Sequence, residues 1–295
     1  MFRRIAIFLL AMLLARPVLG GDSLDSLRQD VRTSPPESPS EPEPASPPSK
    51  SKSQNYSPFG DRCECDEDNN DEFWSVILLG AGVVVTSPFW GPHAILESEH
   101  TTDGYFAAYP YDYTPGSMLF EDALAEELAP QRYSWLMRLR GEYADDFDSL
   151  SRYGGHLLVD TNTRLGFDTE VNYWRQSLAP GVYDNLWQGD ANVLIRFAQN
   201  ESMQMRSGIG LNWLADNTHS DFGFNFTYGG DIYPLRPFVI SADLDAGWLG
   251  EATLIHLRST VGVQWKQVEV YTGYDYLEIG DTQLDGLVAG VRLTF

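Results

Sequence analysis

The chain has 295 residues, of which 43% are hydrophobic and 21% charged, and its formal net charge at pH 7 is −22. This acidity excludes nucleic-acid binding through a basic surface, and the length allows one or two folded domains. No run reaches the roughly 18 uninterrupted apolar residues of a strong membrane-spanning helix, because the nearest one, residues 73–90, contains Gly80, Gly82 and Pro88.

The first twenty residues are organised as a secretory signal peptide. Arg3 and Arg4 precede an apolar core over residues 5–15, and small residues follow around Val18 and Gly20. We therefore expect a signal peptide over residues 1–20, which directs the mature chain out of the cytoplasm. No Cys lies near this site, so a lipid anchor is not expected.

Residues 21–72 are predicted to be a disordered, acidic, Ser/Pro-rich linker that serves as a periplasmic spacer or is a dispensable tail. The composition of residues 33–58 cannot bury a core. Cys63 and Cys65 follow within an acidic cluster, and three interpretations of this cluster stay open. The first is a solvated acidic stretch. The second is a disulfide, either between two chains or within one chain, where the ring that it closes would be strained. The third is a metal site.

Residues 73–131 are predicted to form a periplasmic connector. Its apolar segment, residues 73–90, is expected to be buried or interfacial, and residues 121–129 are expected to form a short helix. His93 and His100 stand among acidic residues, but their spacing matches no zinc-protease motif, so an ordinary polar connector is favoured over a metal site. The aromatic run at 105–113 is expected to pack against the rim of the domain that follows.

From residue 132 to the end, apolar and polar residues alternate in segments of about 9 to 13 residues, which is the length of a tilted membrane-spanning strand. In residues 253–265, for example, Ile255 and Leu257 share one face, and His256 and Arg258 share the other. Ten such segments predict an all-β fold, an antiparallel up-and-down transmembrane β-barrel of about 10 strands (8 to 12) over residues 132–295. The segments start near residues 133, 153, 164, 191, 203, 222, 238, 253, 268 and 287.

The composition of the two faces decides which one points outward. Across the ten segments the apolar face carries no charged residue and has aromatic residues near its ends, as lipid contact requires, whereas a soluble lipid-carrier barrel would have the faces exchanged. The polar face is rich in charges of both signs and is therefore assigned to the lumen. The lumen-facing candidates are Arg138, Arg140, His156, Asp168, Glu170, Arg196, Arg206, His256, Arg258 and Arg292.

The joins between segments predict short periplasmic turns and longer outer loops. We expect the turns at residues 161–163, 199–201, 229–231 and 265–267, and the longest outer loop at residues 176–188. A second outer loop, residues 145–148, is acidic, and we expect that divalent cations could bridge it to anionic lipid headgroups.

The carboxy-terminal segment alternates Leu287, Ala289, Val291, Leu293 and Phe295, and it ends on the aromatic residue. This ending resembles the assembly signal of small outer-membrane β-barrel proteins, in which Val291, Leu293 and Phe295 would be the signal residues. The resemblance covers residues 133–295. It implies a location in the cell outer membrane, with outer-membrane lipids and the barrel assembly machinery as partners, but it is not specific for any activity.

Three functions are therefore considered. The first is a non-enzymatic structural, anchoring or surface-interaction role, and the second is a narrow channel for ions or small solutes. The third is a lipid-modifying enzyme, which needs a His beside a Ser nucleophile. His156 and His256 lie on the polar face, but no Ser pairs with them by spacing and no G-x-S-x-G motif occurs. We therefore expect neither catalysis nor a cofactor.

Overall fold

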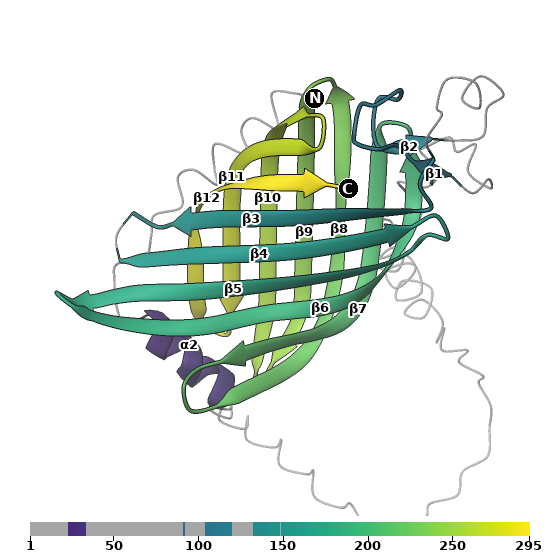
Figure 1. Cartoon of the computed structure of the whole chain (residues 1–295). Helices are drawn as coiled ribbons and strands as arrows, with labels where there is room; N and C mark the ends of the chain where they lie inside the picture. Colours follow the sequence, from purple (N-terminus) through teal and green to yellow (C-terminus); the bar gives the residue numbers. More distant parts are fainter. Residues whose placement is uncertain (1–22, 34–90, 92–103, 120–131, 148) are drawn as a thin grey trace, which may run out of the picture. The chain divides into compact units, whose positions relative to one another are not determined.

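A computed structural model describes residues 23–33, 91, 104–119, 132–147 and 149–295 of the chain. Its ten long strands, β3 to β12, form a closed barrel in which each strand pairs antiparallel with the next and β12 pairs back with β3 (Figure 1). The predicted fold class is therefore confirmed. The expected signal peptide, Cys63 and Cys65, His93 and His100, the apolar segment and the helix at 121–129 all lie outside the described residues.

The described elements before the barrel are α2 (Ser23–Arg32), β1 (Tyr105–Phe106) and β2 (Met118–Leu119). The barrel strands are β3 (Trp135–Asp145), β4 (Leu150–Thr161), β5 (Leu165–Ala179), β6 (Val182–Asn200), β7 (Met203–Ala215), β8 (Ser220–Leu235), β9 (Phe238–Leu249), β10 (Ala252–Trp265), β11 (Val268–Ile279) and β12 (Thr282–Thr294). Within the described part of the chain, no helix has the length and apolarity needed to cross a membrane.

The joins at both ends of the barrel are short, two or three residues at one end and two to four at the other, so the predicted longer outer loops are not seen. At the end where the barrel begins and finishes, here called the proximal mouth, the joins are residues 162–164, 201–202, 236–237 and 266–267. At the opposite end, the distal mouth, the joins are residues 146–149, 180–181, 216–219, 250–251 and 280–281.

Two of the predicted joins are wrong. Residues 176–188 are not a long loop, because β5 and β6 continue through them to a two-residue turn in which Gly181 has a φ of 81°. Residues 229–231 are not a turn but the middle of β8. A Cβ at Gly230 would lie 2.5 Å from the backbone oxygen of Gln204, so this glycine allows two strands to approach closely rather than the chain to reverse.

The outer face of the barrel has an apolar belt between two zones of aromatic residues. Belt residues such as Val193, Ile209 and Val270 have about three-fifths of their surface exposed, at 62%, 60% and 60%. Near the distal mouth the rings of Tyr143, Tyr153, Tyr173 and Trp187 follow one another across four strands, with centroids 5.1, 6.5 and 4.8 Å apart. Exposed aromatic residues near the proximal mouth include Trp135, Phe238, Trp265 and Phe295.

Four strands, β5, β6, β8 and β10, are longer than the predicted 9 to 13 residues. Near the distal mouth, charged residues lie on the outer face of the barrel. Glu278 accepts a hydrogen bond from Tyr276, and Asp285 accepts one from Tyr274. The guanidinium of Arg175 lies 3.8 Å from the ring centroid of Tyr183. The charge-free part of the outer face is therefore bounded on the distal side by tyrosines that hold charged groups.

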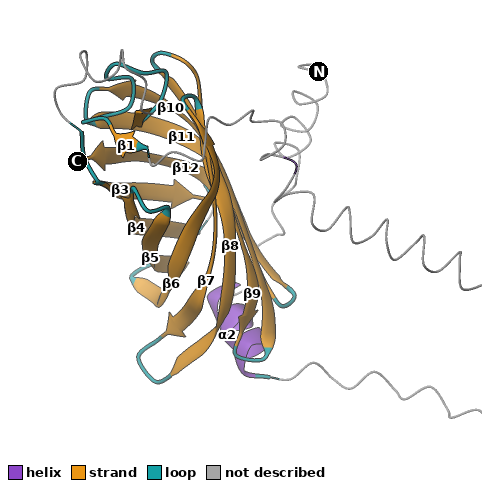
Figure 2. Ribbon diagram, turned by 90° about the vertical axis from the view of Figure 1, so that its right-hand side faces the viewer, coloured by secondary structure: helices purple, strands orange, loops and turns teal. Residues whose placement is uncertain are grey.

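Two segments from before the barrel lie at opposite mouths (Figure 2). Helix α2 sits at the distal mouth, where it contacts strands β6, β10, β11 and β12. Residues 104–119, with the short sheet of β1 and β2, sit at the proximal mouth, where Phe106 pairs with Tyr133. The boundary of the predicted linker is thus corrected, because residues 23–32 form a packed helix.

Candidate functional site

The structure places all ten lumen-facing candidates on the inner face of the barrel. Eight of them are buried, and His156 and Asp168 are half-buried. They fall into a central and a proximal group of charges, and a third, apolar layer lies at the distal mouth.

The central group is a balanced network of three arginines and three carboxylates. Glu170 lies 2.5 Å from Arg140 and 2.6 and 2.8 Å from the two Nη atoms of Arg258. Glu142 lies 2.8 Å from Arg152, and Asp275 lies 2.8 Å from the Nε of Arg258 and 3.1 Å from Arg152. Buried charges are tolerated in this form because each one is both paired and hydrogen-bonded.

Two ion pairs cross the whole lumen, one in the central group and one in the proximal group. Arg258 is on β10 and Glu170 is on β5, which is five steps away around the ten-strand order β10-β11-β12-β3-β4-β5 and therefore on the opposite wall. Arg138 on β3 and Asp231 on β8 are also five steps apart, and their side chains meet at 2.7 Å. Side chains from opposite walls thus join in the middle of the barrel at two levels.

The proximal group gathers arginines around Asp231. Arg206 approaches it at 2.9 Å, and Ser241 donates to it at 2.7 Å while accepting from Arg292 at 3.1 Å. A cavity of about 20 Å³ among these side chains is lined by Arg138, Arg140, His156, Leu158, Asp168, Arg206, Asp231, Asp243 and Arg292. This volume is enough for a water molecule and not for a solute of several heavy atoms.

Both lumen histidines contact carboxylates. His156 lies 3.1 Å from Asp168, and His256 lies 3.0 Å from Asp275 and 3.4 Å from Asp245. Within the described part of the chain, neither histidine has a serine hydroxyl as its hydrogen-bond partner, and no group of three His, Cys, Asp or Glu side chains could hold a metal ion. The geometry therefore offers no serine nucleophile activated by either histidine.

Residues 104–119 add a further layer at the proximal mouth. Phe106 is fully buried beside Met118 and Leu136, and the guanidinium of Arg196 lies 5.0 Å from its ring centroid. Tyr111 donates a hydrogen bond to the carbonyl of Phe238 and packs edge-on against Tyr233. The expected packing of the aromatic run against the rim is therefore seen for Phe106 and Tyr111, whereas Tyr113 is exposed.

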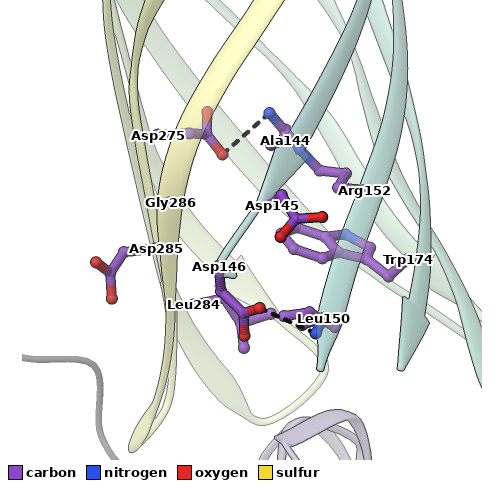
Figure 3. Close-up of a pocket in the computed structure, with 10 residues that line it drawn as sticks. All are labelled: Ala144, Asp145, Asp146, Leu150, Arg152, Trp174, Asp275, Leu284, Asp285 and Gly286. Atoms are coloured by element: carbon purple, nitrogen blue, oxygen red, sulfur yellow. Dashed lines mark hydrogen bonds and ion pairs between the residues drawn. The ribbon is translucent and has the colours of Figure 1, made fainter. Parts of the chain in front are cut away.

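The distal layer was not predicted, because it places apolar residues on the face assigned to charges. A ring of inward-facing side chains, here called the collar, surrounds the distal mouth. The collar consists of Leu150, Trp174, Leu186, Leu214, Leu249, Ala252, Leu254, Leu277, Ile279 and Leu284. A cavity of about 10 Å³ lies where the collar meets Arg152 and Asp275 of the central network, and Figure 3 shows the side chains that line it.

Helix α2 fills the collar with one apolar stripe. Leu24, Leu27 and Val31, spaced three and four residues apart, are 0%, 1% and 1% exposed and belong to the same apolar cluster as the collar. This spacing places them on one face of a helix. It was visible in the sequence, but a helical stripe does not reveal which surface covers it.

The polar edge of α2 is held by acidic residues of the mouth. Arg28 binds both carboxylate oxygens of Asp184, at 2.6 and 2.8 Å. Asp216 lies 3.2 Å from Arg28 and 3.0 Å from Arg32, and Arg32 also reaches Asp221 at 2.9 Å. Because these pairs are partly exposed, each contributes about 0–1 kcal/mol. The buried apolar stripe therefore contributes most of the free energy that holds α2 in the collar.

Asp216 contacts both α2 and the other residues of the loop 216–219, and its pKa indicates how docking of α2 depends on pH. Partial burial raises the pKa of Asp216, but hydrogen bonds from Thr218, His219 and Arg32 together lower it below the usual range. Of these bonds only the one from Arg32 depends on docking of α2, because Thr218 and His219 belong to the same loop as Asp216. The stability that this bond adds to docking is present above the ordinary Asp pKa of about 3.9 and is lost as the pH falls through the lowered folded-state pKa. Docking of α2 is therefore expected to be constant from pH 8 to about 5 and to weaken only under stronger acid.

The mobility of a nitroxide attached to an S26C variant, measured by electron paramagnetic resonance, would check this expectation. Ser26 lies on the exposed face of α2. The matched control is Asp216→Asn, which should loosen the helix already at neutral pH. A transition centred between pH 5 and 8 in the unsubstituted loop would show that another group controls docking.

In the described part of the acidic loop, residues 145–147, both carboxylates accept hydrogen bonds from nearby residues. Asp145 accepts hydrogen bonds from Tyr143 and from the backbone of Phe147, and Asp146 accepts from the backbones of Ser149 and Leu150. Divalent-cation binding at this loop stays a prediction.

Comparisons with known proteins found similarity among solved structures. No protein-family model matches the chain, and no curated protein matches it. A solved structure, the outer membrane channel DcaP of Acinetobacter baumannii, is similar over 65% of this chain and 78% of that chain, with 9% sequence identity and a TM-score of 0.28. No functional argument rests on a similarity of this size.

Proposed function

We propose that this protein is a non-enzymatic outer-membrane β-barrel whose closed lumen makes it an anchor and surface-interaction protein rather than a channel. The observation that carries this proposal is the Arg258–Glu170 pair, which joins opposite walls of the barrel. Outer-membrane lipids and the barrel assembly machinery are the partners that belong to this proposal.

The outer face supports a membrane location. An apolar belt bounded by aromatic residues matches the surface that lipid contact requires. The residues of the predicted assembly signal support insertion, because Val291 and Phe295 have 43% and 52% of their surface exposed on the same outer face. The backbone of Phe295 pairs with Met137 across the seam between β12 and β3.

The lumen supports an anchor over a channel. A solute moving along the barrel axis would have to separate Arg258 from Glu170 and then Arg138 from Asp231. Leaving one buried partner without the other costs about 3–5 kcal/mol for each pair. The collar with α2 at one mouth and residues 104–119 at the other add two further layers.

Planar-bilayer recording would test the proposal. The purified full-length protein should give no stepwise current in 1 M KCl, because the bridged lumen leaves no continuous water path. A heat-dependent gel shift of the same preparation, found in the outer-membrane fraction, would show that the protein tested is a folded barrel. Unitary currents that disappear when the protein is boiled would instead favour the narrow channel.

The lipid-modifying enzyme stays a weaker candidate, because both lumen histidines pair with carboxylates. Hydrolysis of a fluorescent phospholipid by the wild-type protein, lost in both H156A and H256A, would favour it over the anchor.

A further inference from the structure

The outer face of the barrel carries a hollow over strands β5 to β8, toward the proximal mouth. Its volume is about 240 Å³, compared with about 20 and 10 Å³ for the two cavities described inside the barrel. The outward-facing residues that line the hollow are Leu165, Val193, Ile195, Ser207, Ile209 and Phe226. No lining residue is charged, so the hollow fits an apolar ligand and not an ion.

One small residue in a row of large ones accounts for the hollow. The register of β5 to β8 places side by side Leu165, Ile195, Ser207 and Tyr228. The next row toward the distal mouth has a large apolar side chain on each of these strands. The hydroxyl of Ser207 donates to the carbonyl of Thr227 at 3.2 Å, so its proton already has an acceptor. The position therefore presents a short side chain that does not need a polar partner in the ligand.

A β-bulge borders the hollow beside Ser207. The register between β6 and β7 shifts between Arg196 and Ala198, which leaves Phe197 as the extra residue of the bulge. The ring of Phe197 packs against that of Tyr228, with centroids 5.6 Å apart, and Tyr228 is the residue opposite Ser207. Two aromatic rings thus flank the small residue on its proximal side.

We infer that this hollow binds one acyl chain of a phospholipid from the membrane leaflet on the proximal side of the barrel. This inference rests on the proposed location in the outer membrane. An empty hollow at this depth would lose the dispersion contacts of its lining, and the hydrocarbon region holds no water to fill it. Its volume corresponds to about eight groups of the size of a water molecule, at about 30 Å³ each. A segment of one alkyl chain has this size and this chemistry.

The place of the hollow on the strands also gives the direction of the chain. Leu165 is the first residue of β5 and adjoins the proximal join 162–164. Ile209 and Phe226 are paired with each other one row further toward the distal mouth. The carboxyl end of the acyl chain is therefore expected near Leu165, and its methyl end near Ile209 and Phe226.

Photocrosslinking of the full-length protein would test the inference. The protein is reconstituted in vesicles of phosphatidylethanolamine and phosphatidylglycerol that contain a phosphatidylethanolamine with a diazirine in one acyl chain. Labelled residues are identified by mass spectrometry after illumination. Labelling should be stronger at Val193, in the hollow, than at Val270, although the two are 62% and 60% exposed and lie on opposite walls. A diazirine close to the carboxyl end should label Leu165, and one close to the methyl end should label Ile209 and Phe226.

A matched pair of variants tests the shape of the hollow. Ser207→Leu fills it and should abolish the preference for Val193 over Val270. Ser259→Leu makes the same change on the outer face of β10, outside the hollow, and should keep the preference. Heat-dependent gel mobility shows that each variant is folded, and the comparison within the wild-type protein depends on neither of them.

Equal labelling of Val193 and Val270 in the wild-type protein would overturn the inference while leaving the membrane barrel intact. A hollow that is protected from the lipid in a complex of two chains, seen by native mass spectrometry, would assign the surface to a second copy and also overturn it. If neither residue were labelled and the protein did not float with the vesicles, the proposed function itself would have failed, and the inference with it.

Discussion

Replacing Glu170 with glutamine is expected to destabilise the barrel by about 3–5 kcal/mol, the cost of leaving buried charges without their partner. Glutamine keeps the size of the side chain and removes only its charge. Glu170 is the carboxylate shared by Arg140 and Arg258, and Arg152 lies 3.6 Å away, so three buried guanidinium groups would share two carboxylates. Urea unfolding in detergent micelles, followed by tryptophan fluorescence, would measure the loss.

Two matched variants make this result specific. Glu251→Gln removes the same charge from an exposed distal turn and should change the unfolding free energy by less than about 0.5 kcal/mol. The double variant E170Q/R258Q removes both partners of the cross-lumen pair, so its cost should be smaller than the sum of the two single costs. Equal unfolding free energies for E170Q and the wild-type protein would refute the bridged lumen.

Replacing Leu27 with aspartate is expected to release α2 from the collar. Leu27 is 1% exposed, and even truncation of such a leucine to alanine costs about 2–5 kcal/mol. Aspartate adds the penalty of burying an unpaired carboxylate, which the few partly exposed ion pairs of the helix do not offset. Hydrogen exchange measured by mass spectrometry should show protected α2 amides in the wild-type protein and freely exchanging ones in L27D.

The control for this change is Gln29→Asp, which places the same charge on the exposed face of the helix. Its α2 amides should stay protected, and the barrel amides should stay protected in both variants. If the helix remained protected in L27D, its seat would not depend on the collar.

The sequence predicted the strands well because alternation is a local signal. The starts of β7, β9 and β11 match the predicted segments at Met203, Phe238 and Val268. The start of β6 was placed nine residues late, at Ala191 instead of Val182. Residues 182–190 carry Asp184 and Leu186 on the inner face and Tyr183 and Asn185 on the outer face, so neither face is uniform there.

The interior was predicted only by residue type. All ten lumen-facing candidates lie on the inner face, but which of them meet depends on residues far apart in the chain. Arg258 and Glu170 are 88 residues apart, and Arg28 and Asp184 are 156 residues apart. The collar was harder still to predict, because inward leucines such as Leu254 and Leu277 interrupt a polar face. Their position is explained only by helix α2, which covers them.

The pairs across the lumen also constrain the order in which the protein assembles. Arg258 and Glu170 are on strands five steps apart, and so are Arg138 and Asp231, so neither pair can form while the strands are still an open sheet. Their charged groups stay hydrated until β12 pairs with β3. Closure of this seam is therefore the step in which the lumen charges exchange their water for one another.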